Sequence, residues 1–221
     1  MSLTIGYLSM VNNYKYARQA VTNAFFQDYP NINKGVYLIH DYDMEPVHST
    51  LPVMPVHNIY LDEPVIDQRW WILKISRALT VMNENIIVMW DSDDLYEPRY
   101  TDKIASFFVR YPDIQFAWNL EMIDVNMQGL SFKTFNSGIG TLAARAGAFK
   151  NEISKFSSKY RKGTFFSSKK KMDLPLDFPF REYLKKKYEV GDGNWIRAYF
   201  NHPECFSSLT NKDVRKDSIK A

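Results

Sequence analysis

Three aspartates stand close together directly after an apolar run in the middle of the chain. Residues 86–90 are all apolar, and Asp91, Asp93 and Asp94 follow them. Like charges at this spacing repel one another unless water or a cation screens them. Mg²⁺ and Mn²⁺ prefer oxygen ligands and keep coordination positions open for phosphate oxygens. The cluster therefore predicts a site for Mn²⁺ or Mg²⁺, and the alternative is a hydrated turn in which Asp94 caps the next segment.

A second acidic pair, Asp41 and Asp43, follows residues 36–39, which are also apolar. Both acidic groups stand where an apolar strand is expected to end. Ligands of open, mostly parallel sheets bind at the carboxyl ends of the strands. Asp41 and Asp43 are therefore candidates for contacts with the same ligand as Asp91 and Asp93. Because aspartate is common in turns, an ordinary turn is the alternative.

The elements that must position these residues alternate between strand and helix in the first half of the chain. Apolar runs predict strands at 3–11, 36–39, 57–61 and 85–90, and helical spacing predicts helices at 12–27, 67–82 and 98–113. Further along, we expect a strand at 114–124, a mixture of strand, loop and helix at 129–149, and a helix at 177–190. This order predicts an α/β fold, with a Rossmann-like mixed, mostly parallel sheet flanked by helices in a single domain spanning 1–221.

The composition argues against several classes of protein. Hydrophobic residues make up 45% of the 221 residues and charged residues 24%, which is typical of a soluble globular protein. A net charge of +3 does not indicate a polycation that binds nucleic acid with its whole surface. We expect neither a signal peptide nor stable membrane insertion, since no apolar stretch approaches the roughly 20 residues that span a bilayer. Cys205 is the only cysteine, which excludes an internal disulfide and suits the cytoplasm.

Two segments carry a resemblance to a known family. Residues 3–43, LTIGYLSMVNNYKYARQAVTNAFFQDYPNINKGVYLIHDYD, resemble the opening of family 2 glycosyltransferases, and Asn12, Asn13 and FFQDYPNI carry the match. Residues 74–98, KISRALTVMNENIIVMWDSDDLYEP, look like the central DxD segment of that family. The resemblance covers 1–110 well and 135–210 more loosely. It implies a GT-A fold with a nucleotide-sugar-binding half at 1–110, an acceptor half at 111–210 and a charged tail at 211–221.

The resemblance also assigns roles to the donor side of the site. By the pattern of the family, Asp93 is the direct ligand of Mn²⁺ or Mg²⁺, and Asp91 lies near the ribose or a metal-bound water. An acidic residue after the second strand, here Asp41 or Asp43, accepts hydrogen bonds from the base of the donor, which is usually uracil. Asn12 belongs to the turn after the first strand. Lys74 and Arg77 stand where the family often carries a positively charged residue near the diphosphate. A solvated helix face is the alternative for Lys74 and Arg77.

Two further residues complete the chemistry that the resemblance implies. Asp177 stands at the start of an expected helix, where the family places the general base of inverting transfer. Leu176 departs from the pattern, because the family has Glu there, and a simple N-cap is the alternative role for Asp177. His202 resembles the late histidine that completes the metal site in many GT-A enzymes. Phe200 and Asn201 depart from the Arg or Tyr that is frequent there, and a surface histidine is the alternative.

The sequence says least about which acceptor receives the sugar. Asn136, Ser137 and Gly138 resemble the NSG segment beneath the donor sugar, and Trp118 is a candidate on position alone. Residues 155–171 are rich in lysine and interleaved with aromatic residues, which is typical of contacts with phosphates and unstacked bases. Phe165, Lys169, Lys170 and Lys171 would then meet DNA carrying a hydroxymethylated base. A lysine-rich loop or lid is the alternative for this stretch.

Several other functions remain open from the sequence. Polysaccharide, glycolipid and protein acceptors are alternatives to DNA. Sugar nucleotidyltransferases use a similar fold and acidic metal ligands, but they carry a glycine-rich phosphate loop after the first strand, and residues 9–19 contain no glycine. An inactive binding module on the same fold is the third alternative, and the presence of Asp93, Asp177 and His202 argues against it.

Overall fold

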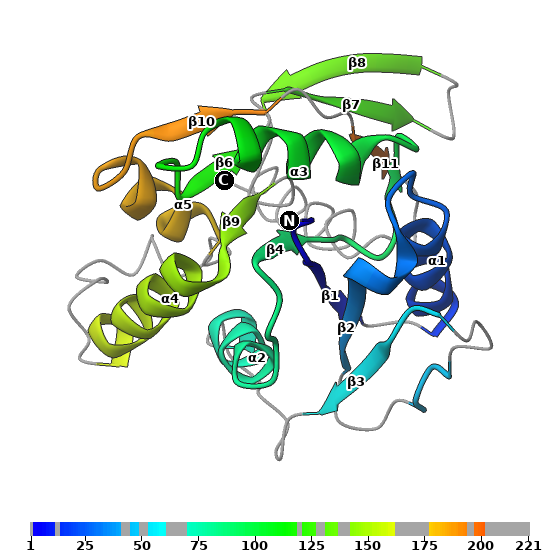
Figure 1. Cartoon of the computed structure of the whole chain (residues 1–221), viewed down its shortest axis with the longest axis horizontal. Coiled ribbons are helices and arrows are strands. Elements are labelled where there is room, and N and C mark those ends of the chain that lie inside the picture. The colour runs from blue at the N-terminus through cyan, green and yellow to red at the C-terminus, as the bar shows by residue number, and fades with distance from the viewer. Residues whose placement is uncertain are drawn as a thin grey trace, which may run out of the picture.

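The computed structural model describes residues 2–11, 14–40, 45–48, 53–60, 70–118, 121–126, 131–136, 142–161, 177–193 and 197–201 (Figure 1). In β7, β8 and β11, and at the start of α5, it describes the backbone alone. In chain order the elements are β1 (Ile5–Val11), α1 (Tyr14–Phe25), the 3₁₀ turn η1 (Asn31–Asn33), β2 (Lys34–His40), β3 (Val56–Tyr60), α2 (Trp70–Leu79), β4 (Ile86–Met89), β5 (Leu95–Tyr96), α3 (Tyr100–Arg110), β6 (Phe116–Trp118), β7 (Glu121–Asn126), β8 (Ser131–Asn136), β9 (Ala143–Arg145), α4 (Ala146–Arg161), α5 (Asp177–Lys185), β10 (Val190–Asp192) and β11 (Arg197–Asn201).

The larger sheet confirms the predicted fold class. Its strand order is β10-β6-β9-β4-β1-β2-β3. Strands β4, β1, β2 and β3 are mutually parallel, β10 is parallel to β6, and β9 alone runs antiparallel to its neighbours β4 and β6. The sheet is therefore mixed and mostly parallel, as the alternation of strand and helix predicts.

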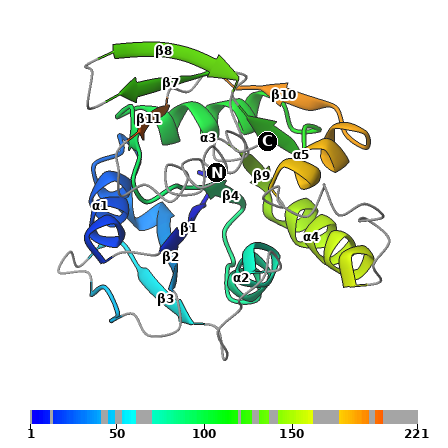
Figure 2. The same cartoon turned by 180° about the vertical axis from the view of Figure 1, so that it is seen from behind.

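Helices cover both faces of this sheet, and each face has its own apolar core. On one face, α1 and α3 pack against β1, β2 and β4; their buried residues include Ala20, Val21, Ile104 and Phe108. On the other face, α2, α4 and α5 contribute Ile75, Phe149, Ile153, Phe156, Phe180 and Leu184. Figures 1 and 2 show the two sets of helices on opposite sides of the strands. Among the described residues, no helix is long and apolar enough to cross a membrane.

A second, smaller sheet is absent from the sequence-based prediction. It has the order β5-β11-β7-β8, and its β7–β8 hairpin lies at the top of Figure 1, apart from the larger sheet. The expectation of one strand at 114–124 is wrong, because β6 belongs to the larger sheet and β7 to the smaller one. The apolar pattern continues through both strands, so it hides the change of sheet.

The lysine-rich stretch is also more ordered at its start than the loop alternative predicts. Helix α4 extends to Arg161, so residues 155–161 are helical. Phe156 is fully buried in the core, where it contacts the ring of Phe180 at 5.1 Å between centroids. The idea that Phe156 belongs to an exposed aromatic-basic loop is therefore wrong. The predicted helix at 177–190 is confirmed at its start, Asp177, but it ends at Lys185, and Val190 belongs to β10.

Candidate functional site

A buried tryptophan fixes the point where β4 gives way to the acidic loop, which we define as residues 91–94. Trp90 is 0% exposed, and its indole Nε1 donates a hydrogen bond to the Ala20 carbonyl of α1 at 3.1 Å. Its ring stacks on Tyr96, with 3.5 Å between centroids, and lies 4.6 Å from the ring of Tyr7. The last apolar residue before the aspartates is thus an anchor in the core rather than the start of a mobile segment.

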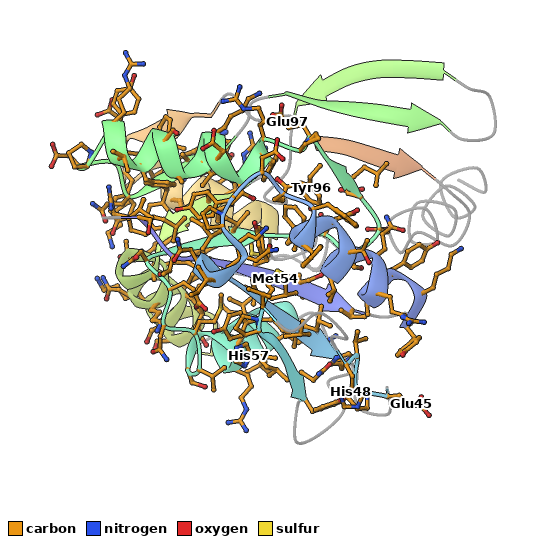
Figure 3. All side chains as sticks on the ribbon, turned by 45° about the vertical axis from the view of Figure 1, so that its right-hand side comes forward. Glu45, His48, Met54, His57, Tyr96 and Glu97 are labelled. Carbon is orange, nitrogen blue, oxygen red and sulfur yellow. The ribbon has the colours of Figure 1, made fainter. Side chains whose placement is uncertain are left out.

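Hydrogen bonds to the main chain hold both ends of the acidic loop. At the first end, the Asp91 amide donates to the Tyr96 hydroxyl at 2.6 Å, and that hydroxyl also lies 3.3 Å from the Asp91 carbonyl. At the other end, the Asn23 side chain on α1 donates to the Asp94 carbonyl at 2.9 Å. Figure 3 shows Tyr96 close to the ribbon of α1. Because these bonds occupy backbone groups, they set the course of the loop without using the carboxylates of Asp91 and Asp93.

Burial alternates along the acidic loop. Ser92 and Asp94 are buried, at 5% and 0% exposed, whereas Asp91 and Asp93 are partly exposed. The two acids of the DxD pair are therefore the ones that solvent reaches. Asp94 is followed by the short strand β5, and α3 begins only at Tyr100 with Arg99 in the N-cap position. The alternative in which Asp94 caps the next segment is therefore wrong for the helix that follows.

The parallel strands bring the carboxyl ends of β1 and β2 to the edge of the sheet where the acidic loop lies. In the register of the sheet, Val11 pairs with His40, and His40 pairs with Tyr60. The Trp90 amide donates to the Leu8 carbonyl, which continues the pairing of β4 with β1 up to the acidic loop. β1 and β2 therefore end beside the acidic loop. Asn12, Asp41 and Asp43 come directly after them in sequence but lie outside the described residues.

A polar network at the ends of β2 and β3 was not predicted from the sequence. His40 is 0% exposed, and its Nε2 lies 2.6 Å from the Asn58 side-chain oxygen. Its ring stacks on Tyr60, with 5.0 Å between centroids. The Asn58 side chain also pairs with the amide and the carbonyl of Val47, both at 2.9 Å. This network fixes residues 45–48 beside β3. The sequence signal is a histidine that ends an otherwise apolar strand.

The described residues do not by themselves form a complete metal site. Among them, no group of three His, Cys, Asp and Glu side chains is placed to hold a metal ion. Of the four histidines in the chain, His48 and His57 lie at the β3 side of the molecule in Figure 3, away from Tyr96 beside the acidic loop. Asp91 and Asp93 fit a hard divalent cation, because both are partly exposed carboxylates on a fixed backbone. His202 lies outside the described residues.

The last strand leads toward the acidic loop. β11 pairs antiparallel with β5, with Arg197 opposite Tyr96 and Ala198 opposite Leu95. Because β5 begins directly after Asp94, the carboxyl end of β11 runs in the direction of the acidic loop. His202 is the residue that follows β11 in sequence.

The two basic residues of α2 occupy different environments. Lys74 is buried, at 6% exposed, whereas Arg77 is exposed in the last turn of the helix. Helical spacing alone does not separate them, because residues three apart are neighbours on a helix surface. Contacts of Lys74 and Arg77 with a diphosphate stay predictions.

Helix α5 places Asp177 at its first position and packs against the end of β6. Phe180 and Leu184 are both 0% exposed, and the Arg181 guanidinium lies over the Trp118 ring at 5.6 Å from its centroid. Trp118 is 2% exposed, so it supports α5 from the core, and its predicted contact with an acceptor stays a prediction.

Only the backbone of Asp177 and Asn136 is described. The remaining acceptor candidates lie outside the described residues: Ser137, Gly138, Phe165, Lys169, Lys170 and Lys171.

Solved structures of glycosyltransferases match this arrangement. The mannosyltransferase PcManGT from Pyrobaculum calidifontis, in complex with GDP-Man and Mn²⁺, superposes with a TM-score of 0.62 at 14% identity, covering 95% of this chain and 60% of that one. TarS 1-349 from S. aureus, in complex with UDP-GlcNAc, gives 0.59 at 14% identity, covering 93% and 61%. The chain has a GT-A-like glycosyltransferase fold. The larger sheet, with its acidic loop after β4, is the core of that GT-A-like fold here.

The match lies in structure rather than in sequence. No protein-family model matches the chain, and neither does the sequence of any curated protein. The chain spans about 60% of the length of PcManGT and of TarS 1-349. The GT-A-like fold that the resemblance implied is confirmed, and the roles of its individual residues remain to be tested.

Proposed function

We propose that this chain is a metal-dependent glycosyltransferase that moves a sugar from a nucleoside-diphosphate sugar to an acceptor hydroxyl. One observation carries the proposal: two partly exposed aspartates, Asp91 and Asp93, follow the central strand β4 on a GT-A-like fold. A negatively charged pyrophosphate would be repelled by these carboxylates without a cation between them. The acidic loop therefore favours a donor that arrives with Mn²⁺ or Mg²⁺.

Asp93 would hold the metal directly, and Asp91 would lie nearer the ribose or a metal-bound water. His202 would complete the protein ligands, and the direction of β11 toward the acidic loop supports that role. When bound, the cation neutralises the charge that develops on the departing diphosphate. The bonds from Tyr96 and Asn23 to the loop backbone would keep the carboxylates in place for the cation.

The nucleotide would bind at the ends of β1 and β2, with Asn12 and either Asp41 or Asp43 near the base. We favour a UDP-type donor, because an acidic residue after the second strand suits the N–H group of uracil. The solved neighbours are in complex with UDP-GlcNAc in one case and GDP-Man in another. Both nucleotides are therefore needed in any binding test. Lys74 and Arg77 would assist at the diphosphate.

Asp177 would act as the general base of an inverting reaction. The acceptor oxygen attacks the anomeric carbon, the bond from that carbon to the diphosphate oxygen breaks, and the hydroxyl proton moves to the Asp177 carboxylate. The diphosphate leaves with the electron pair of the broken bond. The position of Asp177 at the first residue of α5, a helix docked against the core, supports this role.

The proposal also names an acceptor, which is DNA. A hydroxymethylated base in DNA would use Phe165 for stacking and Lys169, Lys170 and Lys171 for phosphates. Asn136, Ser137 and Gly138 would lie beneath the donor sugar, and Trp118 would lie on the acceptor side. Phosphate contacts release counterions, so DNA affinity would fall with salt at a log–log slope of about −0.9 per contact. DNA that does not bind at low salt, with or without donor, would favour a polysaccharide, glycolipid or protein acceptor. We infer a cytoplasmic location from the single cysteine, Cys205.

The test is a calorimetric titration of UDP-GlcNAc and GDP-Man in Mn²⁺ and in excess EDTA. We expect at least one donor to bind in Mn²⁺ and neither in EDTA, and Asp93→Asn to abolish the metal-dependent part. Asp113→Asn is the matched control, since Asp113 is an exposed acid after α3. Release of free nucleotide identifies a transferase, and binding without release identifies an inactive module. Consumption of a nucleoside triphosphate and a sugar 1-phosphate identifies a nucleotidyltransferase. Full donor binding in EDTA contradicts the proposal.

A further inference from the structure

A buried carboxylate outside the proposed donor site joins the two helices at one end of the sheet. Glu152, in the middle of α4, is 0% exposed. Lys187 Nζ donates to both of its oxygens at 2.7 Å, and the hydroxyls of Tyr183 and Tyr188 donate to it at 2.5 and 2.8 Å. Burial raises the pKa of this carboxylate, but the bonds from Lys187 and the two tyrosines outweigh burial and lower the pKa of Glu152 to about 2. The group is therefore ionised at physiological pH.

These contacts bridge two elements that are far apart in the sequence. Glu152 belongs to α4, whereas Tyr183 lies in α5 and Lys187 and Tyr188 lie in the turn that follows α5. We call this set the Glu152 clamp. A second contact of Glu152, from Lys155 at 3.4 Å, stays within α4 and does not reach α5. Lys187 therefore links α4 to the turn after α5, whereas Lys155 contacts the same carboxylate without leaving α4.

Helix α5 depends on tertiary contacts for its position. It has nine residues, and isolated helices shorter than about 12–15 residues are marginal in water. Phe180 and Leu184 bury its apolar side, but apolar contacts are not directional and tolerate small rotations and slides. The hydrogen bonds of an ionised carboxylate are directional and short. The directional bonds of the Glu152 clamp therefore fix the rotation of α5 and its position along its axis.

A contact on another element completes the docking of α5. The Arg181 guanidinium lies over the Trp118 ring at the end of β6, and the Gly193 amide donates to the Trp118 carbonyl at 3.1 Å. With the clamp on α4, this contact holds α5 between two parts of the core. The first residue of the helix so fixed is Asp177.

We propose that Glu152 is a positioning residue that, through Lys187 and Tyr183, fixes α5 and so places Asp177 for the transfer step. The role of Asp177 rests on the proposed function, whereas the clamp itself does not. A misplaced base slows the chemical step but leaves a donor site built on β1, β2 and β4 intact. A shift of about 1 Å in a reacting group is enough to slow a reaction about a hundredfold.

The first arm of the test compares Lys187→Met with Lys155→Met in the full chain. Each variant removes one lysine from Glu152, but only Lys187→Met removes a charged bond that reaches beyond α4, and it leaves the bonds from Tyr183 and Tyr188 in place. We expect amide hydrogen exchange at 181–185 to become about tenfold faster in Lys187→Met and to stay unchanged in Lys155→Met. Amides of α2 serve as the internal reference. Equal exchange at 181–185 in both variants overturns the clamp, whatever the protein does.

The second arm measures donor binding and turnover in the same two variants. The probes are UDP-GlcNAc and GDP-Man with Mn²⁺, and turnover is the release of free nucleotide. We expect Lys187→Met to lower kcat about tenfold to a hundredfold with the donor Kd unchanged, and Lys155→Met to change neither. A clamp that only stabilises the fold would leave kcat of the folded fraction unchanged, and that result overturns the positioning role. A wild-type chain that binds neither donor refutes the proposed function instead, and the exchange arm then decides on the clamp.

Discussion

The Tyr96 hydroxyl and the Asp91 backbone form two hydrogen bonds across five positions of the chain. The amide of Asp91 donates to the hydroxyl at 2.6 Å, and the hydroxyl lies 3.3 Å from the Asp91 carbonyl. Tyr96 is also the strand residue that pairs with Arg197 in β11 and stacks on Trp90. A single residue therefore connects three parts: its side chain contacts the acidic loop and the core of the larger sheet, and its backbone pairs with the last strand of the smaller sheet.

Tyr96→Phe should weaken metal-dependent nucleotide binding without unfolding the protein. The change keeps the ring stack on Trp90 but leaves the Asp91 amide without its acceptor, and an unsatisfied buried donor costs about 1–3 kcal/mol. We expect about a tenfold loss of UDP or GDP affinity in Mn²⁺ by calorimetry. Tyr111→Phe is the control, because Tyr111 is exposed at the end of α3. Unchanged affinity in Tyr96→Phe would mean that the loop keeps its course without this hydroxyl.

Asp177→Asn should preserve the fold and the donor site but remove transfer. Asp177 is the first residue of α5, and asparagine keeps the size and shape of aspartate, so α5 should still begin at the same residue. It lacks the basicity to accept the proton of an acceptor hydroxyl, and we expect turnover to fall by about 10²–10⁴-fold. Release of nucleotide and the donor Kd are measured together. Near wild-type release would leave Asp177 with a capping role alone, and Asp173 would be the next candidate base.

The contribution of Glu152 to the stability of the fold should be lost in acid. Its pKa lies near 2 in the folded protein, against 4.5 for an ordinary glutamate, so the ionised form stabilises the fold above pH 4.5. This contribution is lost as the pH falls from 4.5 through 2, and it is worth about 3 kcal/mol when fully present. We expect the difference in unfolding free energy between wild type and Glu152→Gln to shrink over that range, as measured by urea unfolding. A difference that stays constant from pH 6 to pH 2.5 would contradict the assignment.

Two glycine-to-alanine changes should shift stability in opposite directions. A Cβ on Gly191, in β10, would overlap the ring of Phe107 and crowd Ile114, so Gly191→Ala should destabilise the protein by about 1–3 kcal/mol. A Cβ on Gly147, in the first turn of α4, meets nothing within 4 Å. Gly147→Ala should therefore stabilise by up to about 1 kcal/mol, because alanine loses less backbone entropy on folding. Thermal unfolding of both variants checks the pair, and equal melting temperatures would show that Phe107 moves aside freely.

The sequence predicts the helices and strands that carry a clear local apolar pattern, and it misses those that depend on pairing with distant strands. β1, β2, β4 and α1 to α3 were predicted because their apolar periodicity is uninterrupted. β5 and β10 are only two and three residues long, and their pairing partners lie far away in the sequence, so no local pattern marks them. α4 was predicted only in part. Its apolar residues 149, 153 and 156 do follow helical spacing, but the surrounding lysines and serines suggested a loop.

The site shows the same division. The position of the acidic loop after β4 could be predicted because a carboxylate pair after an apolar run is a local pattern, and the roles of Asp91 and Asp93 stay predictions. The roles of Tyr96 and Glu152 could not be predicted, because both depend on partners brought together by the fold. The three donors of the Glu152 clamp lie 31–36 positions away from it, and nothing near Glu152 in the sequence distinguishes it from a solvated helix residue.

The pairing of β5 with β11 has a consequence for folding kinetics. Arg197 and Tyr96 face each other across a strand pair but lie about 100 residues apart in the chain, and loop-closure entropy makes such contacts form late. β1 and β2 pair across only about 30 residues, so this parallel pair closes a much shorter loop and can form first. The first half of the chain should therefore begin to fold before β11 reaches the acidic loop. In refolding experiments on a variant that keeps Trp90 as its only tryptophan, we expect native-like fluorescence to recover in a faster phase than metal-dependent nucleotide binding.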